Sequence, residues 1–487
     1  MLYSDGAGAP IPPRPKSESF FGRGATVLAG ALLLAWPAVY NRYPLLFPDS
    51  ITYLADGRPV ARALFLHRFS DYYGMRSLLY SLGIFPFHWD VTPWPVVGLH
   101  ALLAAYVLWL VIRSVSQRAN AFRYLILAGL LGLLSSLSWF VSLVMPDVLG
   151  ALAYLAMYLL VFARDTLSRS EHIAVAGVAW WTITSHITHL ALAAGICLLL
   201  AGLLLLRCPP MKLRGKAVCE VAGIVCVAAA SQLALHSYLY GRPSLNADPP
   251  PIVAARVIAD GPGRWYLEKH CGEIELALCD SVRDLPDNTD DFLWNPDGIW
   301  PTAVREGDDR IREEEFAFVV AVVRAYPREQ LSLSAANAWQ QLAAFGLWGL
   351  ERHDWVLEAF DTALPGDKPN YLKSGQFNDD LPLDFFSELQ FWVVAASLGV
   401  LALGAMTPLM RREPSGRLLG LSVVILPAIV ANAVVTGAFS GVEERYQSRV
   451  VWLLPFLAAI LLLHWLDSRL HGAPQRELNS VRETANS

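Results

Sequence analysis

Long runs of apolar residues, separated by short polar stretches, form the dominant pattern of this sequence. A helix needs about 20 mostly apolar residues to cross the hydrocarbon core of a bilayer. Ten runs approach this length, so the pattern predicts an all-α polytopic membrane protein with about ten transmembrane helices. The expected spans are residues 25–43, 94–112, 122–143, 148–163, 172–185, 188–206, 217–238, 386–409, 418–437 and 449–466.

The stretch 172–206 could form one long helix or two short helices separated at Ser185–His189. Short loops rich in Lys and Arg stay on the cytoplasmic side of a membrane. Two helices place every basic loop on that side, together with both termini, so we expect a break in this stretch. The basic residues concerned are Arg113, Arg118, Arg123, Arg164, Arg169, Arg207, Lys212, Arg214, Lys216, Arg411, Arg412 and Arg417.

This topology divides the chain into five parts. We expect a cytoplasmic leader, an N-terminal membrane module of about seven helices, a mixed or mainly helical external insert, about three C-terminal helices and a cytoplasmic tail. The first apolar run is expected to be an uncleaved helix, because no clear small-residue cleavage site follows it. The parts cover residues 1–24, 25–238 with a first external loop at 44–93, 239–385, 386–466 and 467–487.

Composition supports a membrane protein and argues against two other classes. Charged residues make up only 17% of the chain, against about a quarter in an average soluble protein. The formal net charge of −5 does not suggest nucleic-acid binding. The sequence has no Walker-type glycine-rich loop, so nothing in it points to nucleotide hydrolysis.

Two carboxylates stand at the external ends of predicted spans. Asp49 follows Pro48 after the first span, and Asp147 follows Pro146 before the fourth. Asp49 could simply cap the next helix, because aspartate is a favoured N-cap. Two carboxylates at one membrane face also suit acid–base chemistry on a lipid-borne substrate.

Three short motifs resemble those of the GT-C superfamily of polytopic glycosyltransferases. Phe47–Tyr53 resembles the early acidic motif of that family, and Tyr73–Tyr80 resembles the Arg-x-Pro-x-Tyr-Pro stretch that often follows, although both prolines are missing. Glu444–Tyr446 resembles an Arg-Tyr pair before a late helix. The likeness covers the first half of the chain and its last two helices, whereas the insert 239–385 matches no module that we can name.

The resemblance implies transfer of a sugar from a polyprenyl-phosphate-linked donor to a glycan, lipid or protein acceptor, at the external face of a bacterial inner membrane. It implies Asp49 as the general base, and Asp147 as a residue that orients the acceptor or holds a divalent metal. Two other readings are a polysaccharide polymerase or ligase of the O-antigen type and a non-enzymatic transporter of lipid or polysaccharide.

Several basic and polar residues are candidates for binding the donor. Arg445, Arg449 and Arg76 are expected to bind phosphate, although Arg445 and Arg449 could instead snorkel at a helix end. His186 and His189 stand three residues apart and would share one helix face. They could contact phosphate or sugar, bind a metal with Asp147, or simply satisfy a helix break. Tyr53 lies in the first loop and could line the site.

The insert carries the one pair of cysteines that this topology places outside the cytoplasm. Cys271 and Cys279 could form a disulfide there or remain two unpaired thiols. We expect the disulfide, and we expect the insert to cap the active site or to select the acceptor.

Overall fold

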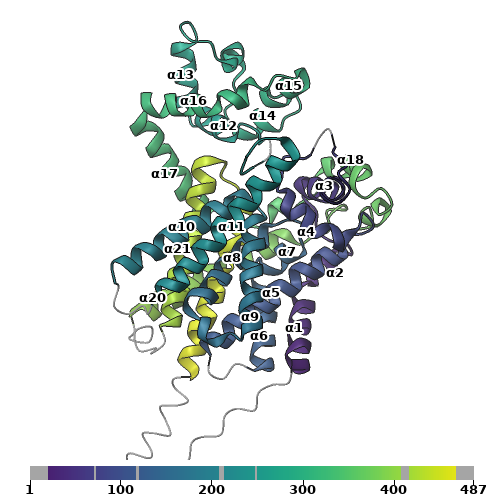
Figure 1. The fold of residues 1–487 in the computed structure, drawn as a ribbon, viewed down its shortest axis with the longest axis vertical. Coiled ribbons are helices and arrows are strands. Elements are labelled where there is room, and N and C mark those ends of the chain that lie inside the picture. The colour runs from purple at the N-terminus through teal and green to yellow at the C-terminus, as the bar shows by residue number, and fades with distance from the viewer. Residues whose placement is uncertain are drawn as a thin grey trace, which may run out of the picture.

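The computed structural model describes residues 20–70, 73–116, 120–207, 213–246, 249–406 and 416–467. In these ranges the chain folds into helices and contains no β-strand (Figure 1). Most of the predicted leader and nearly all of the predicted tail lie outside the described residues, as do Arg118, Lys212, Arg411 and Arg412.

Six of the described helices are long and apolar enough to cross a membrane. Four shorter helices are also apolar, so the all-helical membrane character predicted from the sequence is supported, whereas the count of about ten spans stays a prediction. The six are α5 (Trp94–Val115), α10 (Ile187–Leu205), α11 (Gly215–Tyr240), α20 (Leu383–Met406), α21 (Arg417–Phe439) and the helix Glu444–Asp467, which begins with α22 (Glu444–Val451). The shorter helices are α1 (Phe20–Leu34), α4 (Leu78–His88), α6 (Ala121–Leu134) and α8 (Asp147–Phe162).

Two predicted spans are each interrupted near one end. The span 25–43 divides into α1 and α2 (Trp36–Asn41), and the span 122–143 divides into α6 and α7 (Leu137–Ser142). The predicted break in 172–206 is also found, between α9 (Arg169–Thr184) and α10. His186 is the N-cap of α10 and accepts a hydrogen bond from the backbone N–H of Thr188, which stabilises the new helix start.

Helix α8 lies in the interior of the bundle. Residues 147–161 are all buried, and the helix packs against α5, α9, α21 and α22. The apolar side chains of this helix are therefore covered by neighbouring helices on all sides. Asp147, its first residue, is therefore held inside the protein.

The predicted first external loop, residues 44–93, contains one long helix and one short helix. The long helix is α3, which begins at Pro48 and runs to Leu66, and the short helix is α4. Pro48 suits the first helical position, and the Ser50 hydroxyl accepts a hydrogen bond from the Phe47 N–H. The interpretation of Asp49 as an N-cap is therefore wrong, because it lies inside the first turn.

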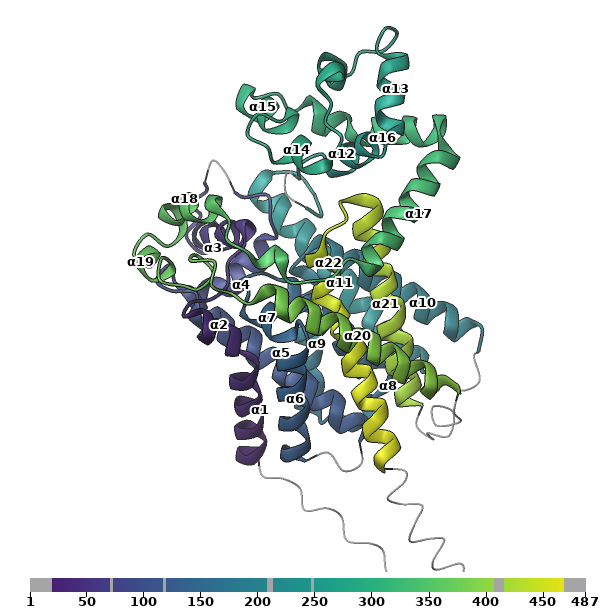
Figure 2. The ribbon, with the colours of Figure 1, turned by 180° about the vertical axis from the view of Figure 1, so that it is seen from behind.

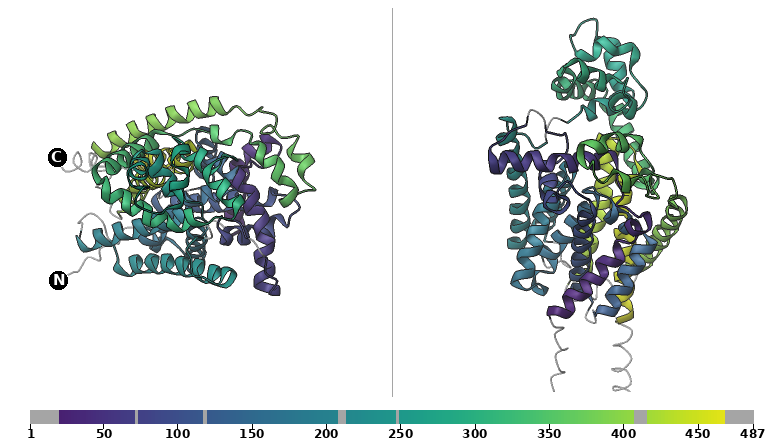
Figure 3. Two further views of the ribbon diagram at one scale, coloured as in Figure 1. Left: turned by 90° about the horizontal axis from the view of Figure 1, so that it is seen from above. Right: turned by 90° about the vertical axis from the view of Figure 1, so that its right-hand side faces the viewer.

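The predicted insert 239–385 consists of two structurally different parts. Helices α12 to α16 bury a core of their own, and we call residues 252–325 the outer lobe. Residues 344–381 instead join the main core, and we call them the inner segment. Figure 3 shows the outer lobe standing beyond the ends of the membrane helices, and Figure 2 shows α17 linking it to the bundle along α21. The elements are α12 (Ile252–Ala259), α13 (Pro262–His270), α14 (Thr289–Leu293), α15 (Ile299–Glu306), α16 (Arg310–Ala325), α17 (Pro327–Ala343), α18 (Asp354–Ala363) and α19 (Lys368–Tyr371).

Hydrogen bonds of one buried residue, Gln376, connect the inner segment to the start of the first loop. Gln376 accepts a hydrogen bond from the Leu46 N–H at 3.0 Å and donates to the carbonyls of Leu46 and Leu350 at 2.8 and 2.9 Å. The Gln376 N–H donates to the Asn41 side chain at 2.6 Å. Buried amides stabilise a fold only when their donors and acceptors are used, as they are here.

Cys271 and Cys279 are joined in a disulfide in the outer lobe, as the sequence predicted. We expect mass spectrometry of unreduced protein to recover the linked peptide. Replacing both cysteines by Ser should lower the free energy of unfolding of the outer lobe by about 2–3 kcal/mol, because a closed loop restricts the unfolded chain. Faster hydrogen exchange in α13 and α16 would report this loss. Free thiols in protein kept from reductants would contradict the prediction.

Candidate functional site

Two five-residue segments with the same pattern run side by side and bring the two predicted carboxylates to one place. They are Leu45–Asp49 and Leu143–Asp147, and each has Leu first and Pro-Asp last. Leu45 and Leu143 form a parallel bridge, with the Leu45 N–H donating to Ser142 at 2.9 Å and the Val144 N–H donating to Leu45 at 3.0 Å. Since both aspartates follow the bridge by four residues, both reach the same region as the first turns of α3 and α8.

Asp49 is held by an arginine of the first loop. Arg76 donates from Nη2 to Asp49 Oδ1 at 2.6 Å, and both side chains are about one-fifth exposed. Gly74 and Ser77 fix this part of the loop, because the Gly74 N–H donates to Asp56 and the Ser77 hydroxyl donates to the carbonyl of Thr184. We call Asp49 and Arg76 the outer pair, because they are the more exposed charges of the site.

Asp147 faces the two predicted arginines of α22. Arg445 Nη1 lies 3.4 Å from Asp147 Oδ2, and Arg449 Nη1 lies 3.8 Å from Oδ1. Asp147 is 2% exposed, and within the described residues its Oδ1 atom has no hydrogen-bond donor. A buried carboxylate with such loose contacts has remaining hydrogen-bonding capacity, which is uncommon outside functional sites. We call these three residues the inner cluster.

The arginines point inward from α22. Arg445 and Arg449 are four residues apart and therefore share one helix face. The guanidinium carbon of Arg445 lies 4.0 Å from the ring centre of Phe47, and Arg449 donates to Asn432 of α21 at 3.1 Å. The alternative of snorkelling side chains is wrong for this pair, because both are largely buried. Two cations in the first turns of a helix also oppose its dipole, so their position needs the nearby carboxylates.

The two histidines lie beside these arginines with opposite tautomers. His186 accepts the Thr188 N–H at Nδ1, so its proton is on Nε2. His189 donates from Nδ1 to the carbonyl of Thr182 at 2.9 Å, so its Nε2 carries a lone pair. That atom is buried against Gly150, where an added Cβ would lie only 2.8 Å away. His186 is the more accessible of the two and offers an N–H donor.

The electrostatic environment keeps His186 uncharged. Burial, followed by the positive fields of neighbouring groups that include Arg449, Arg76 and Arg445, holds its pKa well below the usual range. The Leu45–Leu143 bridge and the contact between Arg445 and Phe47 place the outer pair and the inner cluster in one region. Tyr53 belongs to the same region, and its pKa is raised by burial while Arg76 lowers it and Asp49 and Asp147 raise it. Tyr53 is fully buried against Tyr80, so it forms the wall of the site rather than its surface.

The site combines two carboxylates with three guanidinium groups and so carries a formal charge of +1. Its ligand chemistry is that of an anion such as phosphate, which arginine binds through paired N–H donors. Among the described residues, no group of three or more His, Cys, Asp or Glu side chains is placed to hold a metal ion. The metal site suggested for His186, His189 and Asp147 therefore finds no support in this geometry.

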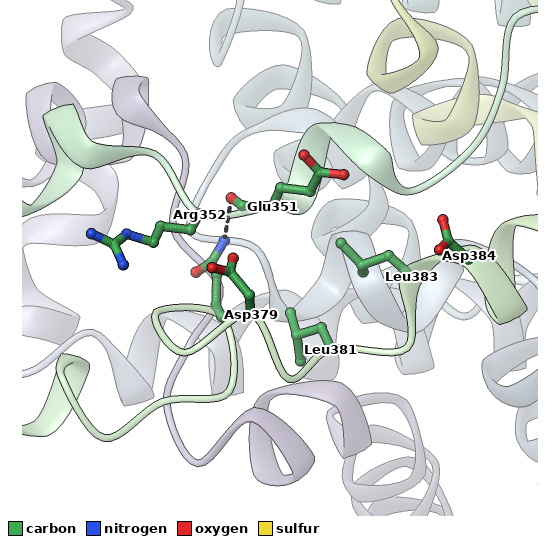
Figure 4. A pocket seen from close by; sticks show the side chains of 7 residues that line it. Glu351, Arg352, Asp379, Leu381, Leu383 and Asp384 are labelled. Atoms are coloured by element: carbon green, nitrogen blue, oxygen red, sulfur yellow. Dashed lines mark hydrogen bonds between the residues drawn. The ribbon is translucent and has the colours of Figure 1, made fainter.

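A cavity of about 210 Å³ lies elsewhere, on the inner segment near the start of α20 (Figure 4). None of the predicted site residues lines it. Gln376 in its wall is already used to fasten the first loop, and Figure 4 shows Arg352 pointing away from Asp384. We therefore place the candidate site at the carboxylates and arginines. The cavity is lined by Glu351, Arg352, Gln376, Asp379, Leu381, Leu383 and Asp384.

Sequence reasoning missed three residues that shape the site. Phe47 lies under Arg445, Asn432 accepts from Arg449, and Asp56 fixes the turn before Arg76. Asp56 had a detectable signal, because it follows Asp49 by seven residues and so falls on the same face of α3. No sequence signal marked Asn432, other than that it is a polar residue inside an apolar span.

Comparisons with protein-family models, with curated proteins and with solved structures found no match to this chain.

Asp56 gives a prediction for the pH dependence of stability. Burial raises its pKa from 3.8 to about 6, and the Gly74 N–H opposes this shift. The Asp56 carboxyl therefore binds its proton more tightly in the folded protein than in the unfolded chain. Its contribution to the free energy of unfolding falls as the pH rises from about 4 through about 6. We expect Asp56→Asn to raise the free energy of unfolding by about 2–3 kcal/mol at neutral pH and to have no effect below about pH 4.

Thermal unfolding in detergent across this pH range would check the prediction. Asp90→Asn is the control, because Asp90 is an aspartate of the same loop that forms an ion pair with Arg58. An Asp56→Asn effect of equal size at pH 4 and pH 8 would contradict a titrating carboxyl.

Proposed function

We propose that this protein is a membrane glycosyltransferase of GT-C type, which moves a sugar from a polyprenyl-phosphate-linked donor to a glycan, lipid or protein acceptor. The observation that carries the proposal is the joint cluster of Asp49, Asp147, Arg76, Arg445 and Arg449 at the ends of apolar helices. A lipid phosphate needs cations near an apolar surface, and the reacting sugar needs a carboxylate beside them. We further propose that the site faces outward from a bacterial inner membrane, with both termini in the cytoplasm.

In the proposed reaction, an acceptor hydroxyl attacks the anomeric carbon of the donor. A new bond forms between the acceptor oxygen and this carbon, and the bond to the phosphate oxygen breaks. Asp49 takes the proton of the hydroxyl, and the polyprenyl phosphate leaves with the electron pair of the broken bond. Guanidinium groups stabilise the charge that develops on the leaving phosphate.

The exposure of the two carboxylates supports this division of roles. The Asp49 side chain is 18% exposed and can meet an acceptor that arrives from water, whereas the Asp147 side chain is 3% exposed and faces two arginines. Asp147 would hold Arg445 and Arg449 in place and accept a hydrogen bond from the substrate through Oδ1. His186 would add one neutral N–H donor toward the phosphate.

Asp49 is paired with Arg76 before a donor arrives, so the base must be released. A phosphate that binds Arg76 competes with the carboxylate for the same N–H donors. In the proposed mechanism, donor binding therefore draws Arg76 away and frees Asp49 for the acceptor. Such an exchange makes the base available only when a sugar is present to be transferred.

We expect Asp49→Asn to lower the rate of sugar transfer by about 10²-fold or more and to leave donor binding nearly intact, because an amide cannot accept the proton. The assay is transfer from a polyprenyl-phosphate sugar in nanodiscs. The matched control is Asp90→Asn, since Asp90 is 21% exposed and also paired with an arginine of the first loop. Near wild-type turnover of Asp49→Asn would remove Asp49 as the base, and a large loss in Asp147→Asn would then assign that role to Asp147.

We expect Arg445→Ala to weaken both donor binding and turnover, because a phosphate contact exists in the ground state and in the transition state. Binding of polyprenyl phosphate to protein in nanodiscs measures the first effect, and the transfer assay measures the second. Arg417→Ala is the control, because it breaks an arginine–aspartate pair of 2.6 Å at the other end of α21. Unchanged lipid binding by Arg445→Ala would remove this arginine from the phosphate site.

A further inference from the structure

The outer lobe reaches the candidate site through one aromatic side chain. In α14, Phe292 and Leu293 turn into the core of the outer lobe, whereas Trp294, the next residue, is 44% exposed. The guanidinium carbon of Arg76 lies 5.6 Å from the centre of the Trp294 ring. Since Arg76 also binds Asp49, the partly exposed indole lies next to the outer pair.

A second contact keeps α14 at this place. Thr289, the first residue of α14, lies so near the turn before α22 that a Cβ on Gly441 would meet its hydroxyl at 3.4 Å. Glu443 is close enough to Asp290 for their charges to interact, and burial followed by this interaction raises the pKa of Glu443. Helix α14 therefore adjoins the turn before α22, and the residue after it contacts the loop that carries Arg76.

The proposed chemistry fixes where the sugar of the donor must lie. The phosphate binds at the arginines, and the anomeric carbon must come within reach of a hydroxyl that Asp49 deprotonates. The sugar ring is therefore next to Asp49 and Arg76, on the side that the acceptor approaches from water. Trp294 is the described aromatic residue of the outer lobe that contacts this position.

We propose that Trp294 is the stacking surface for the sugar ring of the lipid-linked donor, a step that rests on the proposed function. One face of a pyranose presents C–H groups, and an indole offers a large, flat apolar surface with a negative face to meet them. The outer lobe thus contributes to sugar recognition, and the membrane helices contribute to phosphate recognition. The competing interpretation is that Trp294 is only an apolar cover over Arg76. In that case Trp294 would affect the binding of lipids with and without a sugar equally.

The test compares lipids that differ only in the sugar. The probes are decaprenyl phosphate and decaprenyl phosphate bearing glucose, galactose, mannose or N-acetylglucosamine, and binding is measured on the full chain in nanodiscs. We expect at least one sugar-bearing lipid to bind wild-type protein more tightly than the bare lipid. Trp294→Ala should weaken the binding of that lipid about three- to tenfold and leave decaprenyl phosphate unchanged.

Two further variants make the test specific. Trp294→Phe keeps an aromatic face and should retain part of the preference for the sugar-bearing lipid. Trp265→Ala is the matched control, because Trp265 also belongs to the outer lobe and is 43% exposed, but packs against Tyr326 instead of the site. We expect Trp265→Ala to bind both kinds of lipid as wild-type protein does.

The outcomes separate this proposal from the proposed function. Equal weakening of both kinds of lipid by Trp294→Ala would overturn sugar stacking in favour of a cover, and no weakening of either would also overturn it. Sugar stacking would also be overturned if wild-type protein bound every sugar-bearing lipid no more tightly than decaprenyl phosphate. If wild-type protein binds neither kind, or if Arg76→Ala and Arg445→Ala bind both as well as wild type, the phosphate site itself is wrong and the proposed function fails with it.

Discussion

The backbone pairing of Leu45 with Leu143 is the contact on which the rest of the site depends. It holds two extended segments in parallel, and each segment then enters a helix through Pro-Asp. Proline favours the first helical turn, and a carboxylate in that turn meets the positive end of the helix dipole. Two segments about a hundred residues apart in the chain thereby deliver two negative charges to one place, and the three arginines are needed to compensate them.

That compensation explains why so many charges tolerate burial beside apolar helices. An unpaired buried ion is costly, and removing one partner of a buried pair leaves the other without compensation. Arg445 and Arg449 are therefore tied to Asp147, and Phe47 and Asn432 complete their surroundings. The inner segment contributes indirectly, because Gln376 fixes Leu46 between the Leu45 bridge and Phe47.

The sequence was informative wherever one local pattern was sufficient. Apolar runs located the long helices, the polar stretch Ser185–His189 located the break before α10, and the cysteine spacing allowed the disulfide that is present. Asp49, Asp147, Arg76, Arg445 and Arg449 were all selected from motifs and positions, and the structure brings them together. Their chemistry stays a proposal, because proximity shows what a site can bind and not what it converts.

The features that the sequence did not reveal depend on contacts between distant segments. A hydrophobic pattern gives the face of a helix but not its partner, so it could not show that 239–385 divides into a lobe with its own core and a segment that joins the main core. It also could not show that Trp294 meets Arg76.

The division of residues 239–385 assigns different tasks to the outer lobe and the inner segment. The inner segment fastens the loop that carries Asp49, so it must stay fixed for the site to exist. The outer lobe is attached mainly through α17 and touches the site at α14, so its contribution can vary while the charged cluster remains intact.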